Sequence, residues 1–132
     1  MAKLSKPKTS KALATFCAKV AADKIAEDII VIDLQKIEKS TTDFSVLCST
    51  DSTNQSIAIL DAILRQNKKN GLPKPRVEGE INAEWILIDF FDVVMHIMLK
   101  PIREYYDIEN LWADCVFYEF NVNTEKLNKV KI

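Results

Sequence analysis

Glycine is scarce in this chain of 132 residues, which contains only Gly71 and Gly79 and no Gly-Ser pair. A loop that cradles nucleotide phosphates relies on closely spaced glycines, so their scarcity argues against a nucleotide site of that kind. Histidine is limited to His96, and the three cysteines form no C-x-x-C pair. This set favours buried, reduced thiols over disulfides or a zinc site.

Long apolar runs are also missing. No stretch approaches the roughly 18 apolar residues of a membrane-spanning helix, and Lys19 interrupts the apolar run that follows the lysine-rich start, which argues against a secretory signal. We therefore expect a cytoplasmic protein with no membrane contact. The length suits one domain. We expect a flexible basic N-terminus over residues 1–8, a single domain over residues 9–114 and a C-terminal tail over residues 115–132.

The net charge is only −1, which argues against broad neutralisation of nucleic-acid phosphates. The charge is unevenly distributed, however. Residues 1–22 hold five lysines and residues 65–76 hold five basic residues, both without an acid. Residues 78–114 hold nine acidic residues against Lys100 and Arg103. The acidic stretch is either an ordinary solvated face or a surface that attracts a basic partner.

Hydrophobic periodicity and turn residues predict the elements of the fold. The sequence Ser52-Thr-Asn-Gln55 matches a capping box at a helix start, and two prolines limit residues 72–78 to at most an edge strand. Helices are predicted over residues 9–24 and 53–69 and from about Pro101, and strands over residues 28–33, 44–48, 72–78, 85–89 and 93–98. This order predicts an α+β fold: a two-layer α–β sandwich with a mixed, roughly five-stranded sheet and about three helices.

Residues 85–98 are predicted to form an antiparallel hairpin. Alternation along each strand places Trp85, Leu87 and Asp89 on one face, and Asp92, Val94, His96 and Met98 together on one face of the next strand. Asp89 and Asp92 flank the turn, where carboxylates commonly accept backbone amides. For His96, a structural hydrogen bond and an interface role both remain open.

Seven short motifs occur in an order that resembles the ribosomal silencing factor (Iojap) family. The resemblance covers about residues 10–114. The motifs are Asp28-Ile-Ile-Val-Ile-Asp33, Thr42-Asp43-Phe44, Glu78-Gly79-Glu80, Trp85-Ile-Leu-Ile-Asp89, Asp92-Val-Val-Met-His96, Arg103-Glu-Tyr-Tyr106 and Leu111-Trp112.

The resemblance implies a nucleotidyltransferase-like topology without the catalytic site. It implies docking on ribosomal protein fourteen of the large subunit, which blocks joining of the small subunit and represses translation when nutrients are short. No cofactor is implied, and contact with ribosomal RNA is expected to be incidental at most. A second copy of the chain is a further candidate partner for the free protein.

Candidate partner-binding residues combine aromatic side chains with nearby acids, which suit a basic protein better than RNA phosphates. Core packing explains either tryptophan equally well, and the sequence leaves that choice open. The candidates are Trp85, Asp89, Asp92, His96, Tyr105, Tyr106, Leu111 and Trp112.

The chain departs from the family pattern at two turns. Thr50, Asp51 and Ser52 stand where a small Gly-Thr-Ser turn is expected, and Asn54 replaces a common arginine. Phe91 occupies a hairpin position where many relatives carry glycine, so we expect its backbone not to need a positive φ.

An enzyme is the main alternative. Metal-dependent nucleotidyl transfer needs converging carboxylates and a glycine-rich phosphate cradle. Asp28, Asp33, Asp89 and Asp92 supply carboxylates, but the cradle is missing. A general protein-interaction domain is the third possibility. We predict a protein that is not an enzyme and binds neither metal nor cofactor.

Overall fold

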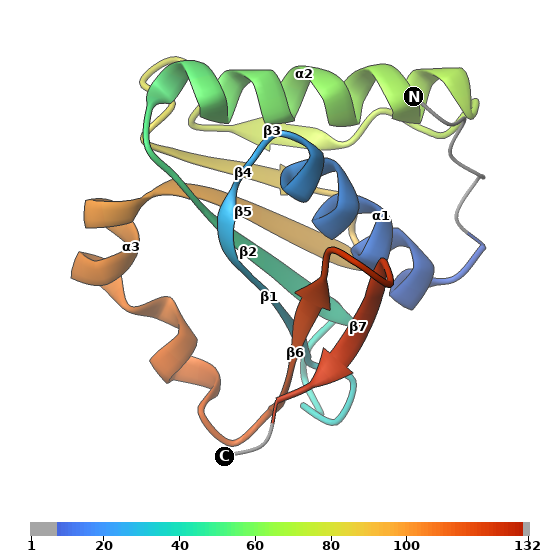
Figure 1. The fold of residues 1–132 in the computed structure, drawn as a ribbon. Helices are drawn as coiled ribbons and strands as arrows, with labels where there is room; N and C mark the ends of the chain where they lie inside the picture. The colour runs from blue at the N-terminus through green and yellow to red at the C-terminus, as the bar shows by residue number, and fades with distance from the viewer. Residues whose placement is uncertain (1–7, 131–132) are drawn as a thin grey trace.

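Residues 8–130 are described by a computed structural model, in which three helices flank one sheet (Figure 1). The helices α1 (Ser10–Asp23) and α2 (Thr53–Lys69) cover one face of the sheet. The shorter α3 (Lys100–Tyr106) and a 3-10 helix, η1 (Ile108–Trp112), pack on the other face. The expected flexible N-terminus falls almost wholly on residues 1–7, which lie outside the described residues. No described helix combines the length and the apolar character needed to cross a bilayer.

Over the described residues the sheet is mixed and has seven strands in the order β3-β4-β5-β2-β1-β6-β7. The central pair β2 and β5 is parallel, and every other neighbouring pair is antiparallel. The strands are β1 (Glu27–Asp33), β2 (Phe44–Thr50), β3 (Arg76–Glu78), β4 (Trp85–Asp89), β5 (Val93–Leu99), β6 (Val116–Asn121) and β7 (Lys126–Lys129).

The expectation of five strands is wrong by two, and both additional strands lie within residues 115–132. There β6 pairs with β1, and β7 pairs with β6 at the sheet edge. Five of the six residues of β6 are half-buried, with no alternation. Alternation of apolar and polar residues is the usual sequence sign of a strand. The β6–β7 ribbon at the sheet edge is only partly covered on either face, so its sequence shows no such alternation.

The helix ends follow from local hydrogen bonds. The predicted helix over residues 53–69 is confirmed as α2. The hydroxyl of Ser52 accepts the amide of Gln55 at 3.1 Å, while the side-chain oxygen of Gln55 accepts the amide of Asp51 at 2.8 Å. Thr9 caps α1 in the same way, its hydroxyl accepting the amide of Ala12 at 3.0 Å. These bonds satisfy amides that have no partner within the helix.

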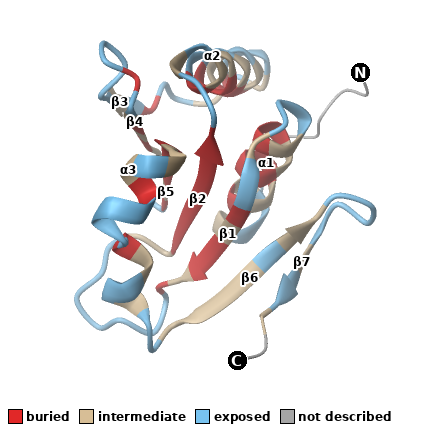
Figure 2. Ribbon diagram, turned by 60° about the vertical axis from the view of Figure 1, so that its left-hand side comes forward, coloured by how far each residue is buried: buried red, intermediate tan, exposed pale blue. Residues whose placement is uncertain are grey.

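Two hydrophobic clusters lie on opposite faces of the sheet. The main one lies beneath α1 and α2 and includes Val46 and Cys48 of β2. The smaller one lies beneath α3 and η1, where Leu47 of β2 packs with Met98 and Ile108. Consequently every residue of β2 is buried (Figure 2).

The hairpin turn corrects a second expectation, because the φ angle of Phe91 is +76°. The carboxylate of Asp89 accepts the amide of Phe91 at 2.7 Å and holds this tight turn. A short connection between antiparallel strands demands a left-handed residue whatever the side chain. The phenylalanine at this position therefore does not mark a relaxed turn.

Candidate partner-binding face

The face of β4 and β5 that points away from α1 and α2 carries three of the eight predicted residues, Trp85, Asp89 and His96. Cross-strand pairing puts Trp85 opposite Met98, Leu87 opposite His96, and Asp89 opposite Val94, so the predicted alternation is confirmed. The smaller cluster under α3 includes Met98, whereas Leu87 and Val94 belong to neither hydrophobic cluster and are half-buried. The sheet is thus partly open next to α3.

Four predicted residues meet at the border between this open face and α3, and we call them the aromatic cluster: Trp85, His96, Tyr105 and Tyr106. The ring of Trp85 lies 5.1 Å from that of Tyr106 and 6.0 Å from that of His96, measured between centroids. Tyr105 stands edge-on to Tyr106 at 5.0 Å. Tyr105 and Tyr106 are 80% and 53% exposed. These spacings are typical of stabilising aromatic pairs.

A hydrogen bond joins the two residues of the aromatic cluster that lie in the sheet. The indole Nε1–H of Trp85 donates to Nδ1 of His96 at 3.1 Å, so the histidine acts as a neutral acceptor. Burial lowers the pKa of His96 from 6.5 to about 4, because the charged imidazolium is disfavoured away from water. His96 is therefore uncharged at physiological pH, and the structural and interface interpretations both survive.

The other four predicted residues lie outside the aromatic cluster. The carboxylate of Asp89 accepts a backbone amide in the turn, as expected. Asp92 uses its backbone carbonyl instead, which accepts the amides of Asp43 and Phe44 at 2.7 and 3.2 Å. Leu111 on η1 is 75% exposed. Trp112 is half-buried against the smaller hydrophobic cluster.

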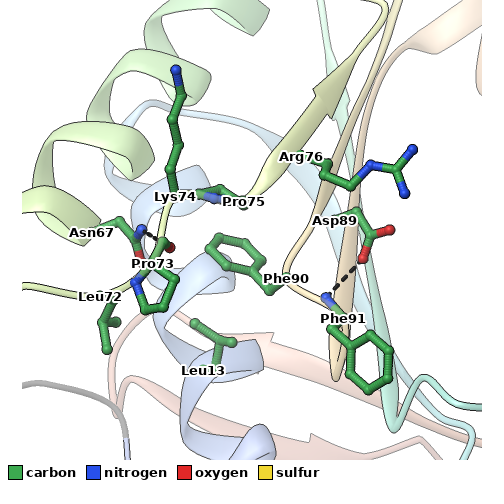
Figure 3. A pocket seen from close by; sticks show the side chains of 10 residues that line it. All are labelled: Leu13, Asn67, Leu72, Pro73, Lys74, Pro75, Arg76, Asp89, Phe90 and Phe91. Carbon is green, nitrogen blue, oxygen red and sulfur yellow. Dashed lines mark hydrogen bonds between the residues drawn. The ribbon is translucent and has the colours of Figure 1, made fainter.

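A mainly apolar cavity of about 380 Å³ lies near the β4–β5 turn (Figure 3). In the close-up, Phe90 points toward Leu13 and the prolines, whereas Asp89 and Phe91 lie at the rim. This cavity is at the turn end of the hairpin, and none of the aromatic cluster lines it. Its lining residues are Leu13, Asn67, Leu72, Pro73, Lys74, Pro75, Arg76, Asp89, Phe90 and Phe91.

Sequence reasoning missed the structural importance of Arg103, which is 8% exposed. Its Nη1 donates to the carbonyl oxygen of Asp28 at 2.6 Å and to the hydroxyl of Ser49 at 2.9 Å. Its Nε donates to the carboxylate of Glu109 at 3.3 Å. Arg103 thereby fastens α3 and η1 to β1 and β2, and so positions Tyr105 and Tyr106. Its place in the Arg-Glu-Tyr-Tyr motif was the only available signal.

The turn that departs from the family pattern makes internal contacts. Thr50 and Ser56 share a hydrogen bond of 2.7 Å between their hydroxyls. The carboxylate of Asp51 pairs with Lys100 at 2.7 Å, and Glu27 pairs with the same ammonium at 2.6 Å. These two partners raise the pKa of Lys100. This turn therefore links α2 to the start of α3.

The carboxylates considered for nucleotidyl transfer are spread over the fold. Asp28 and Asp33 stand near opposite ends of β1, and Asp89 and Asp92 belong to the hairpin turn. Among residues 8–130, no group of three or more histidine, cysteine or acidic residues is placed to hold a metal ion.

The cysteines sit in environments that disfavour the nucleophilic thiolate. Cys17 and Cys48 are fully buried. Burial raises the pKa of Cys48 to about 12 and raises that of Cys17 as well. A thiol that stays protonated is a poor nucleophile and a poor metal ligand.

Together these features define a class of protein: an α+β domain that leaves part of one sheet face open beside an exposed aromatic cluster. Comparison with known proteins identifies the family. A profile described as "ribosomal silencing factor during starvation" matches residues 7–131. The chain belongs to this family of regulatory proteins.

Three similar proteins illustrate the match. The ribosomal silencing factor of Bacillus subtilis is 36% identical over 104 residues, which cover 79% of this chain and 87% of that protein. A mouse protein named for mitochondrial assembly of the ribosomal large subunit is 33% identical over 91 residues, covering 67% of this chain and 40% of that protein. A crystal structure of a Chromobacterium violaceum protein matches with a TM-score of 0.74 at 30% identity, covering 80% of this chain and 88% of that one.

Proposed function

We propose that this protein binds the large ribosomal subunit in the cytoplasm, at ribosomal protein fourteen, and sterically prevents the small subunit from joining. Translation is thereby repressed when nutrients are short. The single observation that carries the proposal is the exposed aromatic cluster beside the open face of β4 and β5. Family membership supports a ribosomal target, and this face offers a surface suited to bind a protein there.

Aromatic side chains at the rim of a half-open face are suitable anchors for a protein partner. Tyrosine and tryptophan are enriched among the residues that dominate binding energy, because they bury much area at a small entropic cost. Tyr105 and Tyr106 already expose most of their surface. Trp85 is half-buried behind Tyr106 and can be covered further.

The charge around the aromatic cluster favours a basic partner. Glu84, immediately before β4, and Glu104 and Asp107, at α3, are all exposed. The cations of α3 are engaged, since Lys100 pairs with Glu27 and Asp51, and Arg103 is buried in its own pairs. Acidic rims attract basic proteins and repel phosphates. Ribosomal proteins are generally basic, so contact with ribosomal RNA is expected to be incidental.

We infer that the protein acts by binding a partner, not as an enzyme, and that it uses no cofactor. The rival is an active nucleotidyltransferase, and the topological relation to that fold remains an expectation. Titration calorimetry with magnesium and each nucleoside triphosphate separates the two. A dissociation constant in the micromolar range, worth about −8 kcal/mol, would support the enzyme.

Co-sedimentation with purified ribosomal subunits tests the proposed function. We expect the protein to sediment with large subunits, to avoid small subunits and to lower the yield of joined ribosomes when it is in excess. The double variant Tyr105→Ala/Tyr106→Ala should lose most of this binding. The matched control is Val122→Ala, which removes a side chain 66% exposed at the β6–β7 turn. Equal sedimentation with both subunits, or with neither, would contradict the proposed function.

In the absence of ribosomes, the exposed aromatic cluster also suits contact with a second copy of the chain. We propose that the same face forms a homodimer when no ribosome is present. Analytical ultracentrifugation of the wild type and of the double tyrosine variant tests this. A dimer that persists in the variant would place the contact elsewhere.

A further inference from the structure

His96 lies at the border between the open face and α3, in an unusual position for a polar side chain. Its flanking residues on the neighbouring strands are Leu47 of β2 and Leu87 of β4, and Val94 and Met98 follow the same face of β5. The imidazole is only 7% exposed. A buried polar group among apolar neighbours normally has every hydrogen-bonding atom satisfied.

Among residues 8–130, only one of the two ring nitrogens has a hydrogen-bond partner. Nδ1 accepts the indole N–H of Trp85. A neutral imidazole carries its proton on the nitrogen that is not accepting, so the proton of His96 is on Nε2. Within residues 8–130, Nε2–H has no hydrogen-bond partner, and Nε2 is not among the atoms that are both fully buried and unpaired. Among the described residues this donor is therefore left for water or for a bound molecule.

Binding of a partner to this face changes which atoms can accept the hydrogen bond of Nε2–H. At present water can accept the hydrogen bond of Nε2–H. A bound protein displaces the water, and a buried donor left without an acceptor disfavours the complex. The apolar neighbours cannot accept the bond, so the acceptor has to come from the partner.

We propose that His96 is a positioning and specificity-determining residue of the partner-binding face; this inference rests on the proposed function. Through Nδ1 it holds the indole of Trp85 beside Tyr106. Through Nε2–H it donates to an oxygen acceptor of the bound protein, such as a backbone carbonyl.

This arrangement restricts the kind of partner surface that can bind the face. The partner carries positive charge toward the acidic rim and presents an oxygen acceptor to His96. A lysine or arginine head placed over His96 would bring donor against donor and leave Nε2–H unpaired. A purely apolar patch would leave it unpaired as well. Sites built around a specific hydrogen bond reject ligands that cannot complete it.

The tautomer can be tested on the free protein. Long-range ¹⁵N–¹H correlation spectra report which ring nitrogen is protonated, and the indole N–H of Trp112 provides an internal reference for that of Trp85. We expect a proton on Nε2 only, and a shifted Trp85 indole signal in His96→Leu with no change at Trp112. A proton on Nδ1 would overturn the proposal without any ribosome being involved.

A double-mutant cycle on binding to purified large subunits separates the two roles of His96. His96→Leu removes both hydrogen bonds, and Trp85→Phe removes only the indole donor. We expect His96→Leu to weaken binding roughly tenfold in the wild-type background and still several-fold in the Trp85→Phe background, as for one buried hydrogen bond. A loss that vanishes in the Trp85→Phe background, or no loss at all, would overturn the donor role.

Two further variants keep the result interpretable. His96→Gln retains a donor near the position of Nε2 and should bind more tightly than His96→Leu. Equal binding of the two would count against the donor. Met95→Leu changes the neighbouring β5 residue, which is buried on the opposite face, and should bind like the wild type. If the wild type itself fails to bind large subunits, the proposed function fails, whereas binding that is insensitive to His96 overturns only this inference.

Discussion

Gly79 and Trp85 approach so closely that no side chain fits between them. A Cβ atom at position 79 would lie 2.1 Å from the carbonyl oxygen of Trp85, and the φ angle of Gly79 is +80°. Real Cβ atoms do not approach backbone oxygens at this distance. The β3–β4 connection therefore depends on glycine to place the start of β4, and with it the aromatic cluster.

Gly79→Ala should lower the free energy of unfolding by roughly 3 kcal/mol or more, because backbone overlap adds to the strain of a positive φ. Gly71→Ala is the matched control. Its φ is +67°, but nothing lies within 4 Å of the added Cβ, so a loss of about 1–2 kcal/mol is expected. Urea unfolding of both variants measures the difference, and equal losses would contradict the role assigned to Gly79.

Arg103 fastens α3 and η1 to the sheet, so its loss should destabilise the fold. Arg103→Met should cost about 3–5 kcal/mol, since it leaves Glu109 without its partner in a buried network. Arg76→Met removes an arginine whose side chain is 81% exposed and which pairs loosely with Glu78 at 3.9 Å, so a change within about 0.5 kcal/mol is expected. Thermal unfolding compares the two, and a tolerant Arg103→Met would show that α3 is held by its apolar contacts alone.

Much of the fold could be predicted because the local signals agree with the tertiary structure. The capping residues and apolar stripe of α2 specify its two ends, and alternation in the β4–β5 hairpin placed Trp85 and His96 on one face. The strands β6 and β7 escaped prediction, because a half-covered edge ribbon needs no alternating pattern. The role of Arg103 escaped because its partners Asp28 and Ser49 are distant in sequence. Periodicity reports burial along one element and says nothing of such pairings.

The site was predictable in part for a related reason. Aromatic residues next to acids mark a binding surface, but only the tertiary structure gathers Trp85 with Tyr105 and Tyr106. Asp89 serves the turn, and Trp112 packs against the smaller hydrophobic cluster. Residue type alone could not separate these roles.

The two tryptophans should respond differently to truncation. Both rings pack against the smaller hydrophobic cluster, but Trp85 also contacts the exposed Tyr106. Trp112→Ala should therefore mainly lower stability, by about 3 kcal/mol. Trp85→Ala should lower stability and also weaken binding to large subunits about thirtyfold, or roughly 2 kcal/mol. Tyr105→Ala is the control for pure anchoring, since Tyr105 is 80% exposed. If the Trp85→Ala variant is stable and binds large subunits like the wild type, Trp85 is not part of the binding site.

Thiol reactivity should follow burial. Cys17 and Cys48 are fully buried, whereas Cys115 is partly accessible. Burial and the nearby carboxylates of Asp114 and Asp33 raise the pKa of Cys115, so it should react slowly. Under native conditions at mild alkaline pH, mass spectrometry should find one alkylated cysteine, and after unfolding it should find three. Rapid native modification of Cys17 or Cys48 would contradict the buried, protonated state.

The pH dependence of stability should carry a contribution from His96. Burial lowers its pKa from 6.5 to about 4 in the folded protein, so between these values the unfolded chain binds more protons than the folded one. The free energy of unfolding should therefore fall as the pH falls through 6.5, with most of the loss, roughly 3 kcal/mol, reached near pH 4. Protonation also removes the acceptor of the Trp85 indole. His96→Leu lacks this contribution but keeps every carboxylate, so the difference between the two urea-unfolding profiles isolates it. The profiles should diverge already between pH 6.5 and 5, before most carboxylates titrate. Parallel profiles across that range would mean that His96 is not held neutral by the fold.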